Sequence, residues 1–296
     1  MSRLMKEKTL YGDPDAFAQE MSKMIDDEEW SDIKFLVGDE RRIMCSHRSM
    51  LAARCAVFRA MLSVPPSEGE DPNTPLVLSD ISPPIFLSVL EFIYTNSCKL
   101  SSEFVSEVLR AAIEFGLDGL RRICVQFMRE SMSVDTVCEY VQAALMYEQV
   151  DLQAECLEYI EVKTEEVFKT SAFREISDEA LAFILQSDLL NIDEVEILSR
   201  VKEWAGVNAL ASNKSLGDTV ERVISHVRFP LLDQEYLSLV EKENEVKKYI
   251  PVSFISSAWR YHARKEVDSN NPQLCPRKGT VPRDSLQPMG LGVSTS

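Results

Sequence analysis

The hydrophobic pattern of the first 130 residues switches between helical and strand spacing. After Asp13, a stripe of apolar positions recurs at the spacing of one helix face and predicts a short amphipathic helix at the start of the fold. An apolar run at 33–37, a turn that begins at Gly38 and a returning run at 41–45 predict a β-hairpin. The helical stripe consists of Phe17, Met21, Met24 and Ile25.

Helical spacing resumes after the hairpin. Apolar positions between 46 and 62 predict two short helices that are broken near Cys55. Four prolines between 63 and 75 predict a loop, which a third strand follows at 76–78. Proline in the first turn and a strong apolar face predict a helix that starts near residue 83, and two more helices end this part near residue 130. We therefore expect an α+β domain with a short mixed sheet flanked by helices.

Strand signals end near residue 130, and only helical stretches follow between 134 and 263. Ser177 and Asp193 precede acidic turns, as helix N-caps do. Short connections predict antiparallel helical hairpins, so an all-α domain is expected. The expected organisation is an N-terminal segment at 1–13, the α+β domain at 14–130, the all-α domain at 131–264 and a disordered tail at 265–296.

The tail is expected to be disordered because its sequence turns to Pro, Ser, Gly and Asn with few apolar residues. Arg277, Lys278 and Arg283 make it mildly basic on an acidic protein. We interpret it as a solubilising tail. Binding to an acidic partner and a nuclear import signal are the alternatives.

Composition excludes several classes of protein. A formal net charge of −16 repels phosphate backbones, so we expect no binding of nucleic acid or of an anionic membrane by the folded part. The chain has no run of 18 apolar residues and residues 1–11 lack an apolar signal-peptide core, so neither a membrane span nor secretion is expected. The seven cysteines form no C-x-x-C pair and most lie in apolar helical patterns, which favours reduced thiols in the cytoplasm or nucleus, or both.

Two parts of the chain resemble known domains. The first part resembles the BTB/POZ domain at 31–33 (SDI), 45–54 (CSHRSMLAAR), 58–62 (FRAML) and 90–96 (LEFIYTN). The second part is similar to the BACK domain at 187–190 (SDLL), Glu196, Trp204 and 226–232 (HVRFPLL). The resemblance covers residues 14 to about 264 and implies a BTB/POZ domain followed by an all-helical BACK domain. Many relatives carry Kelch repeats after the BACK domain, and this sequence shows none.

The BTB/POZ resemblance implies a homodimer in which the opening helix packs across a two-fold axis against a second copy. Such an obligate interface would bury on the order of 2,000 Å² or more. The alternative is that the opening helix only covers its own core. Asp32 and Arg48 match charged family positions near the dimer groove, or they form a structural ion pair that orients strand and helix. The implied interface consists of Phe17, Met21, Met24, Ile25, Trp30, Asp32 and Arg48.

The resemblance also implies docking of cullin-3, the scaffold of a ubiquitin ligase. The family docks it through the loop after the second helix pair, the helix that bears Tyr94 and the first BACK helices. The loop departs from the pattern of tight binders, because Pro66 stands where an apolar residue two positions before Glu68 is expected. A dimeric scaffold or transcriptional co-regulator without a ligase is the alternative. The candidate cullin contacts are Phe58, Met61, Pro66, Glu68 and Tyr94.

The sequence contains no recognisable catalytic or metal-binding motif. Cys45 and His47 are too close together for a structural zinc site and lack the two further ligands that such a site needs. No cysteine lies in a signature of a Cys–His nucleophile, and no glycine-rich phosphate loop is present. We therefore expect a non-enzymatic interaction adaptor without metal or cofactor. Its expected partners are a second copy of itself, cullin-3 and a client protein that the sequence does not identify.

Overall fold

The computed structural model describes residues 9–10, 12–64, 74–264 and 271–283. The contacts within the chain divide it into two compact units, Met1–Ser131 and Met132–Ser296. The first unit contains all three strands of the described residues, and the second contains only helices and their connections. The expected fold class, an α+β part followed by an all-helical part, is therefore confirmed.

The first unit is built on a three-stranded mixed sheet. β1 (Ile33–Val37) lies in the centre, antiparallel to β2 (Arg42–Ser46) and parallel to β3 (Leu76–Leu78). Alternate side chains of β1 are buried, which fixes the face that packs on the core. The turn after β1 uses Gly38 at φ +71°, a left-handed conformation that glycine adopts without strain, and its N–H donates to the Leu78 carbonyl at 2.9 Å.

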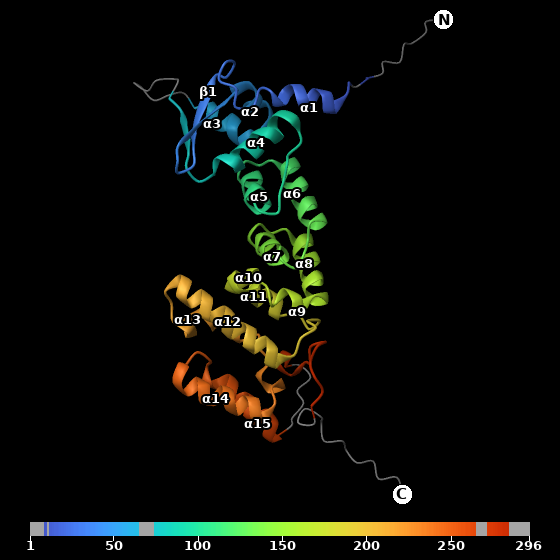
Figure 1. The fold of residues 1–296 in the computed structure, drawn as a ribbon, viewed down its shortest axis with the longest axis vertical. Helices are drawn as coiled ribbons and strands as arrows, with labels where there is room; N and C mark the ends of the chain where they lie inside the picture. The colour runs from blue at the N-terminus through green and yellow to red at the C-terminus, as the bar shows by residue number, and fades with distance from the viewer. Residues whose placement is uncertain (1–8, 11, 65–73, 265–270, 284–296) are drawn as a thin grey trace, which may run out of the picture. The chain divides into compact units, whose positions relative to one another are not determined.

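In the described part of the first unit, six helices accompany this sheet, with α2, α3 and α4 beside it in Figure 1. The break between α2 and α3 lies at Cys55, whose backbone is extended and whose thiol donates to the Phe115 carbonyl at 3.1 Å. The sequence thus located the break correctly. The helices are α1 (Pro14–Ser22), α2 (Arg48–Arg54), α3 (Ala56–Leu62), α4 (Pro83–Thr95), α5 (Val105–Glu114) and α6 (Asp118–Glu130).

An aromatic cluster forms the centre of the first unit. Phe58 of α3 is fully buried and stacks on Phe115 with ring centroids 4.7 Å apart. Phe35 of β1 meets Phe58 and Phe86 edge to face, at centroid distances of 5.9 and 5.1 Å. Offset stacking and edge-to-face contacts are the preferred arrangements of aromatic rings and add to the free energy of burial. The cluster therefore fixes the sheet, α3 and α4 in one arrangement.

The second unit stacks helices in neighbouring pairs, of which α7 with α8, α12 with α13 and α14 with α15 stand out in Figure 1. Trp204 on α12 lies in the core, and its indole N–H donates to the Ile176 carbonyl at 2.7 Å. The elements are α7 (Val137–Met146), α8 (Val150–Val162), α9 (Thr164–Val167), α10 (Ser171–Glu175), α11 (Asp178–Leu185), α12 (Glu194–Ser212), α13 (Leu216–Ile224), η1 (Phe229–Leu231), α14 (Gln234–Lys247), α15 (Val252–Arg264) and η2 (Pro272–Leu274).

Several helix boundaries in the second unit differ from the expectation. The short helices α9 and α10 were not expected, because they are too brief to show a helical period. α12 and α14 continue past their last expected apolar positions and end at Asn213 and Lys248, which adopt φ values of +53° and +49°. These last turns bury only alanine and asparagine side chains (Ala205, Ala209 and Asn244), so no large apolar residue marks them in the sequence pattern.

The expectation of a disordered tail is wrong for residues 271–283, which we call the strap. The strap packs on the second unit and is the red segment near α9 and the start of α12 in Figure 1. Its Lys278 and Gly279 N–H groups donate to the carbonyls of Asp188 and Leu190 at 2.9 and 3.1 Å. Composition predicted disorder because it counts apolar side chains, whereas the strap is held by polar contacts. The other residues of the expected tail, 265–270 and 284–296, lie outside the described residues.

Candidate functional site

The opening segment leaves two aromatic side chains in solvent, Phe17 on α1 and Trp30 in the turn before β1. α1 begins where the Asp13 side chain accepts the Asp15 N–H at 2.9 Å, and it lies against α4 of its own unit. None of its residues is buried, and the side chains of Phe17 and Trp30 are 63% and 70% exposed. Met21 is half-buried. The expected apolar stripe therefore exists, but its own domain covers it only in part.

The stripe is also less regular than expected. α1 ends at Ser22, so Met24 and Ile25 belong to the turn that follows the helix rather than to the helix itself. Both side chains are half-buried. Phe17 and Trp30 are the apolar members of the predicted interface whose side chains are exposed, while Met21, Met24 and Ile25 are half-buried.

Asp32 ties the start of β1 to the start of α2. Its carboxylate accepts the backbone N–H of Arg48 at 2.7 Å, and its carbonyl accepts from Arg48 Nε at 3.3 Å. Arg48 is the first residue of α2, and the side chain of the capping residue His47 makes no capping hydrogen bond. Asp32 therefore supplies an acceptor that a helix N-terminus needs. These contacts orient strand and helix, and the role of both residues in a dimer stays a prediction.

Two of the predicted cullin contacts belong to the core, which corrects the expectation for them. Phe58 is fully buried in the aromatic cluster, and Tyr94 is 3% exposed. The Tyr94 hydroxyl joins Ser46 Oγ at 3.0 Å and His47 Nδ1 at 2.8 Å, and it accepts the His47 backbone N–H at 3.0 Å. The family resemblance named these two residues from their places in the BTB/POZ motifs, and such a match does not say whether a partner or the domain itself covers a side chain. Met61 is half-buried, while Pro66 and Glu68 lie outside the described residues.

The structure assigns Cys45 and His47 to packing and hydrogen bonding within the first unit. Cys45 is buried, and the His47 ring is paired with Tyr94. In the described part of the chain, no three His, Cys, Asp or Glu side chains are grouped as a metal site would require. Burial raises the pKa of the thiols of Cys124, Cys138 and Cys156 to about 12, so all three are protonated at neutral pH. None of the helices in the described ranges has the length and apolar character of a membrane span.

A polar site that the sequence did not predict lies in the second unit, where the strap docks. Arg277 of the strap donates from Nε to Glu194 Oε1 at 2.5 Å, and both side chains are fully buried. Its remaining nitrogens donate to the carbonyls of Ser187 and His226. Arg228 completes the site, because its backbone N–H donates to Glu194 Oε2 and its guanidinium pairs with Asp188.

A second arginine of the strap is bound at the start of α12. Arg283 donates to Asp193 Oδ1 at 2.6 Å and to the Leu231 carbonyl at 2.8 Å, and the Val281 N–H donates to Asp193 Oδ2. Burial by itself raises the pKa of Asp193, but the hydrogen bonds from Val281, Arg283 and Val195 outweigh it and hold the pKa below its usual value. We call the surface formed by Asp188, Asp193, Glu194 and the backbone of 187–192 the acidic groove.

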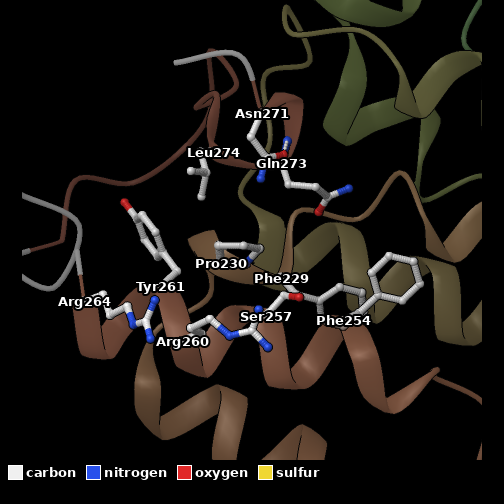
Figure 2. A pocket seen from close by; sticks show the side chains of 10 residues that line it. All are labelled: Phe229, Pro230, Phe254, Ser257, Arg260, Tyr261, Arg264, Asn271, Gln273 and Leu274. Carbon is white, nitrogen blue, oxygen red and sulfur yellow. Dashed lines mark hydrogen bonds between the residues drawn. The ribbon is translucent and has the colours of Figure 1, made fainter. Parts of the chain in front are cut away.

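The strap also closes one side of a cavity of about 450 Å³. Figure 2 shows Asn271, Gln273 and Leu274 of the strap opposite side chains from α15. Two of these, Arg260 and Arg264, lie one helical turn apart on α15. They give the cavity a basic lining, in contrast to the acidic groove. The wall opposite the strap is completed by Phe229, Pro230, Phe254, Ser257 and Tyr261.

Comparison with known proteins agrees with this organisation. The BTB/POZ domain model matches residues 21–132, and the model of the BACK domain (BTB And C-terminal Kelch) matches residues 137–242. The BTB/POZ domain-containing protein 19 of Bos taurus and that of Homo sapiens are each 37% identical over 276 residues, 93% of this chain and 94% of theirs. The solved BTB domain of zebrafish PATZ1 covers 42% of this chain and 100% of its own at 22% identity, with a TM-score of 0.33.

The two matched regions fall on the two units of the structure. The BTB/POZ match spans the sheet and α2 to α6, and the BACK match begins at α7 and extends into α14. BTB and BACK domains are generally non-catalytic domains of protein interaction. The motifs, the order of the two domains and the relatives at 37% identity together show that the chain belongs to the BTB/POZ family, with a BACK domain after its BTB/POZ domain.

Proposed function

We propose that this protein is a non-enzymatic adaptor that forms a homodimer through the opening segment of its BTB/POZ unit and holds other proteins on its remaining surface. The observation that supports the homodimer is the exposure of Phe17 and Trp30, together with the half-buried Met21 that lies one helical turn from Phe17 on α1. Exposed apolar side chains that cluster on one surface mark interaction sites, and tryptophan is enriched where interfaces are strongest. A second copy of the chain would cover these side chains.

A homodimer would work by proximity. Each copy carries one BACK unit, so a dimer presents two identical arms and holds bound partners at a raised effective concentration near one another. In this mechanism the adaptor needs no catalytic residue, because any chemistry belongs to the proteins that it brings together.

The dimer is tested by sedimentation velocity at micromolar concentration. We expect the wild-type chain to sediment as a dimer and the variant Phe17→Glu with Trp30→Glu to sediment as a folded monomer, because buried unpaired carboxylates oppose association. The variant Val246→Glu is the matched control, since Val246 is 84% exposed on α14 of the other unit. A wild-type chain that sediments as a monomer would exclude the proposed dimer.

Cullin-3 is the partner that we propose for the BTB/POZ unit, on the strength of the family resemblance. Among the candidate cullin contacts that the structure describes, Met61 on α3 keeps part of its side chain at the surface. Val64, three residues further along the chain, is 72% exposed. We expect the purified N-terminal domain of cullin-3 to bind the wild-type chain and to lose at least about tenfold in affinity for Met61→Glu. If the intact dimer does not bind cullin-3, the ligase role is excluded and the scaffold or co-regulator alternative takes its place.

The proposed location is intracellular, in the cytoplasm, the nucleus or both. Five of the seven cysteines are buried as free thiols, which fits a reducing compartment. Imaging of the tagged full-length chain in cells tests this location, and recovery of the protein from the culture medium would contradict it.

A further inference from the structure

We propose that the acidic groove of the second unit is a recognition site for peptides of the pattern Arg-x-Gly-x-x-x-Arg, and that the strap occupies it as a tethered ligand. The pattern is that of Arg277, Gly279 and Arg283. A partner with the same pattern would compete with the strap for the groove. This site lies wholly in the BACK unit and depends neither on dimerisation nor on cullin-3.

The first position of the pattern requires arginine. All three guanidinium nitrogens of Arg277 donate, to Glu194, to the Ser187 carbonyl and to the His226 carbonyl, in a fully buried pocket. The planar guanidinium group carries N–H donors on three sides and therefore matches the three acceptors, whereas the single ammonium group of lysine would leave acceptors unpaired. The pocket therefore distinguishes arginine from lysine, which a general attraction between charges does not.

The third position of the pattern requires glycine. A Cβ atom at Gly279 would lie 2.5 Å from the Asn191 carbonyl carbon and would also overlap the backbone of Ile192. Because these neighbours are backbone atoms, no side-chain movement relieves the overlap. The close approach of the two backbones lets the Gly279 N–H donate to the Leu190 carbonyl at 3.1 Å. Peptides that add a strand to the edge of a sheet bind through the same kind of backbone hydrogen bond.

The groove complements its occupant in charge. The strap holds three basic residues and no acidic one, and its Arg277 and Arg283 pair with the carboxylates of Glu194 and Asp193. The Asp188 carboxylate pairs with Arg228 of the groove itself, while the Asp188 carbonyl accepts the Lys278 N–H. At the far end, Arg283 pairs with Asp193 while both side chains are less than one-fifth exposed. A basic peptide is therefore the partner that this surface selects, on a protein whose net charge is −16.

The strap resembles a docked ligand more than a part of the core. It adds little apolar burial, since Val281 is 53% exposed and Cys275, Pro276 and Lys278 are exposed. Its contacts are hydrogen bonds and ion pairs that a separate peptide of the same pattern would make equally well. Only residues 265–270 join it to α15, and a cut there would leave the strap held by these contacts alone.

The test uses the full-length chain with a protease site in place of residues 265–270. After cleavage, a fluorescent peptide of residues 271–283 is added, and its binding is followed by anisotropy. We expect the cleaved protein to exchange its strap for the peptide and to bind at least about tenfold more tightly than the uncleaved protein, in which the tether keeps the strap at a high effective concentration. Peptides with Arg277→Lys or Gly279→Ala should bind at least about tenfold more weakly, and Lys278→Ala is the matched control.

Two results would overturn the proposal. In the first, the cleaved protein keeps its helical circular dichroism but does not bind the peptide, or binds the Arg277→Lys and Gly279→Ala peptides as well as the unaltered one. In the second, cleavage unfolds the BACK unit and excess peptide does not restore it, which would make the strap an integral part of the fold. Recovery of the helical signal on addition of the peptide would support the proposal.

Discussion

Glu194 and Arg277 stand 83 positions apart in the sequence and form an ion pair in which both side chains are fully buried. Two charges lose their hydration in such a pair, so their attraction stabilises the fold only when other hydrogen bonds satisfy the remaining atoms. Here the second carboxylate oxygen of Glu194 accepts the Arg228 N–H, and the remaining nitrogens of Arg277 donate to carbonyls. The pair is therefore specific in geometry and sensitive to the loss of either partner.

We expect Arg277→Ala to undock the strap while the helices stay folded. Removal of one partner from a buried pair costs about 3 to 5 kcal/mol in other proteins, which is enough to favour the open form. Trypsin should then cleave after Arg283 at least about tenfold faster, with unchanged helical circular dichroism. Val281→Ala is the matched control, because that side chain is half exposed. Cleavage at the wild-type rate would show that the ion pair does not hold the strap.

Tyr94→Phe should destabilise the BTB/POZ unit by about 1 to 3 kcal/mol. The substitution leaves the buried N–H of His47 without its acceptor, and a buried unsatisfied donor carries the full cost of its lost hydration. Urea unfolding measures the change, with Tyr159→Phe in the other unit as the control. If Tyr94 were only a partner contact, unfolding would be unchanged and cullin-3 binding alone would fall.

Asp32→Ala should cost about 1 kcal/mol, the usual contribution of a side-chain acceptor at a helix N-terminus. The cause is loss of the hydrogen bond from the Arg48 N–H, which begins α2. Thermal unfolding of the variant is compared with that of Asp39→Ala, an exposed aspartate in the hairpin turn. A melting temperature equal to that of the control would contradict the capping role.

The BACK unit should lose stability as the pH falls through about 6.5. Burial, and then the positive charge of Arg277, lower the pKa of His226 below the ordinary histidine value of 6.5. The unfolded chain therefore binds the proton more tightly than the folded chain, and protonation favours unfolding from pH 6.5 down toward the lowered value. Unfolding free energies measured between pH 7.5 and pH 5 should fall less steeply for His226→Gln than for wild type. If the unfolding free energies of wild type and His226→Gln fell equally with pH, His226 would be excluded as the cause of the loss of stability.

The sequence by itself determined the elements of the first unit and the order of the longer helices in the second, but not the short helices α9 and α10. Two apolar runs around the turn at Gly38 identified the hairpin, the helical pattern placed a break near Cys55, and proline in a first turn marked the start of α4. These features depend on neighbours a few positions away in the chain, which a local pattern records in full. The motifs at 45–54 and 187–190 indicated the BTB/POZ and BACK domains through their resemblance to known members of these families.

Only the tertiary structure decided which side chains meet. The family resemblance named Phe58 and Tyr94 as candidate partner contacts, yet the fold determined that they point into their own core. The basic residues of the tail were visible in the sequence, but Arg277 finds Glu194 only because helices α12 to α15 return the chain to the start of α12. Contacts between distant residues depend on how the whole unit packs, and no local pattern of hydrophobic and polar positions records that packing.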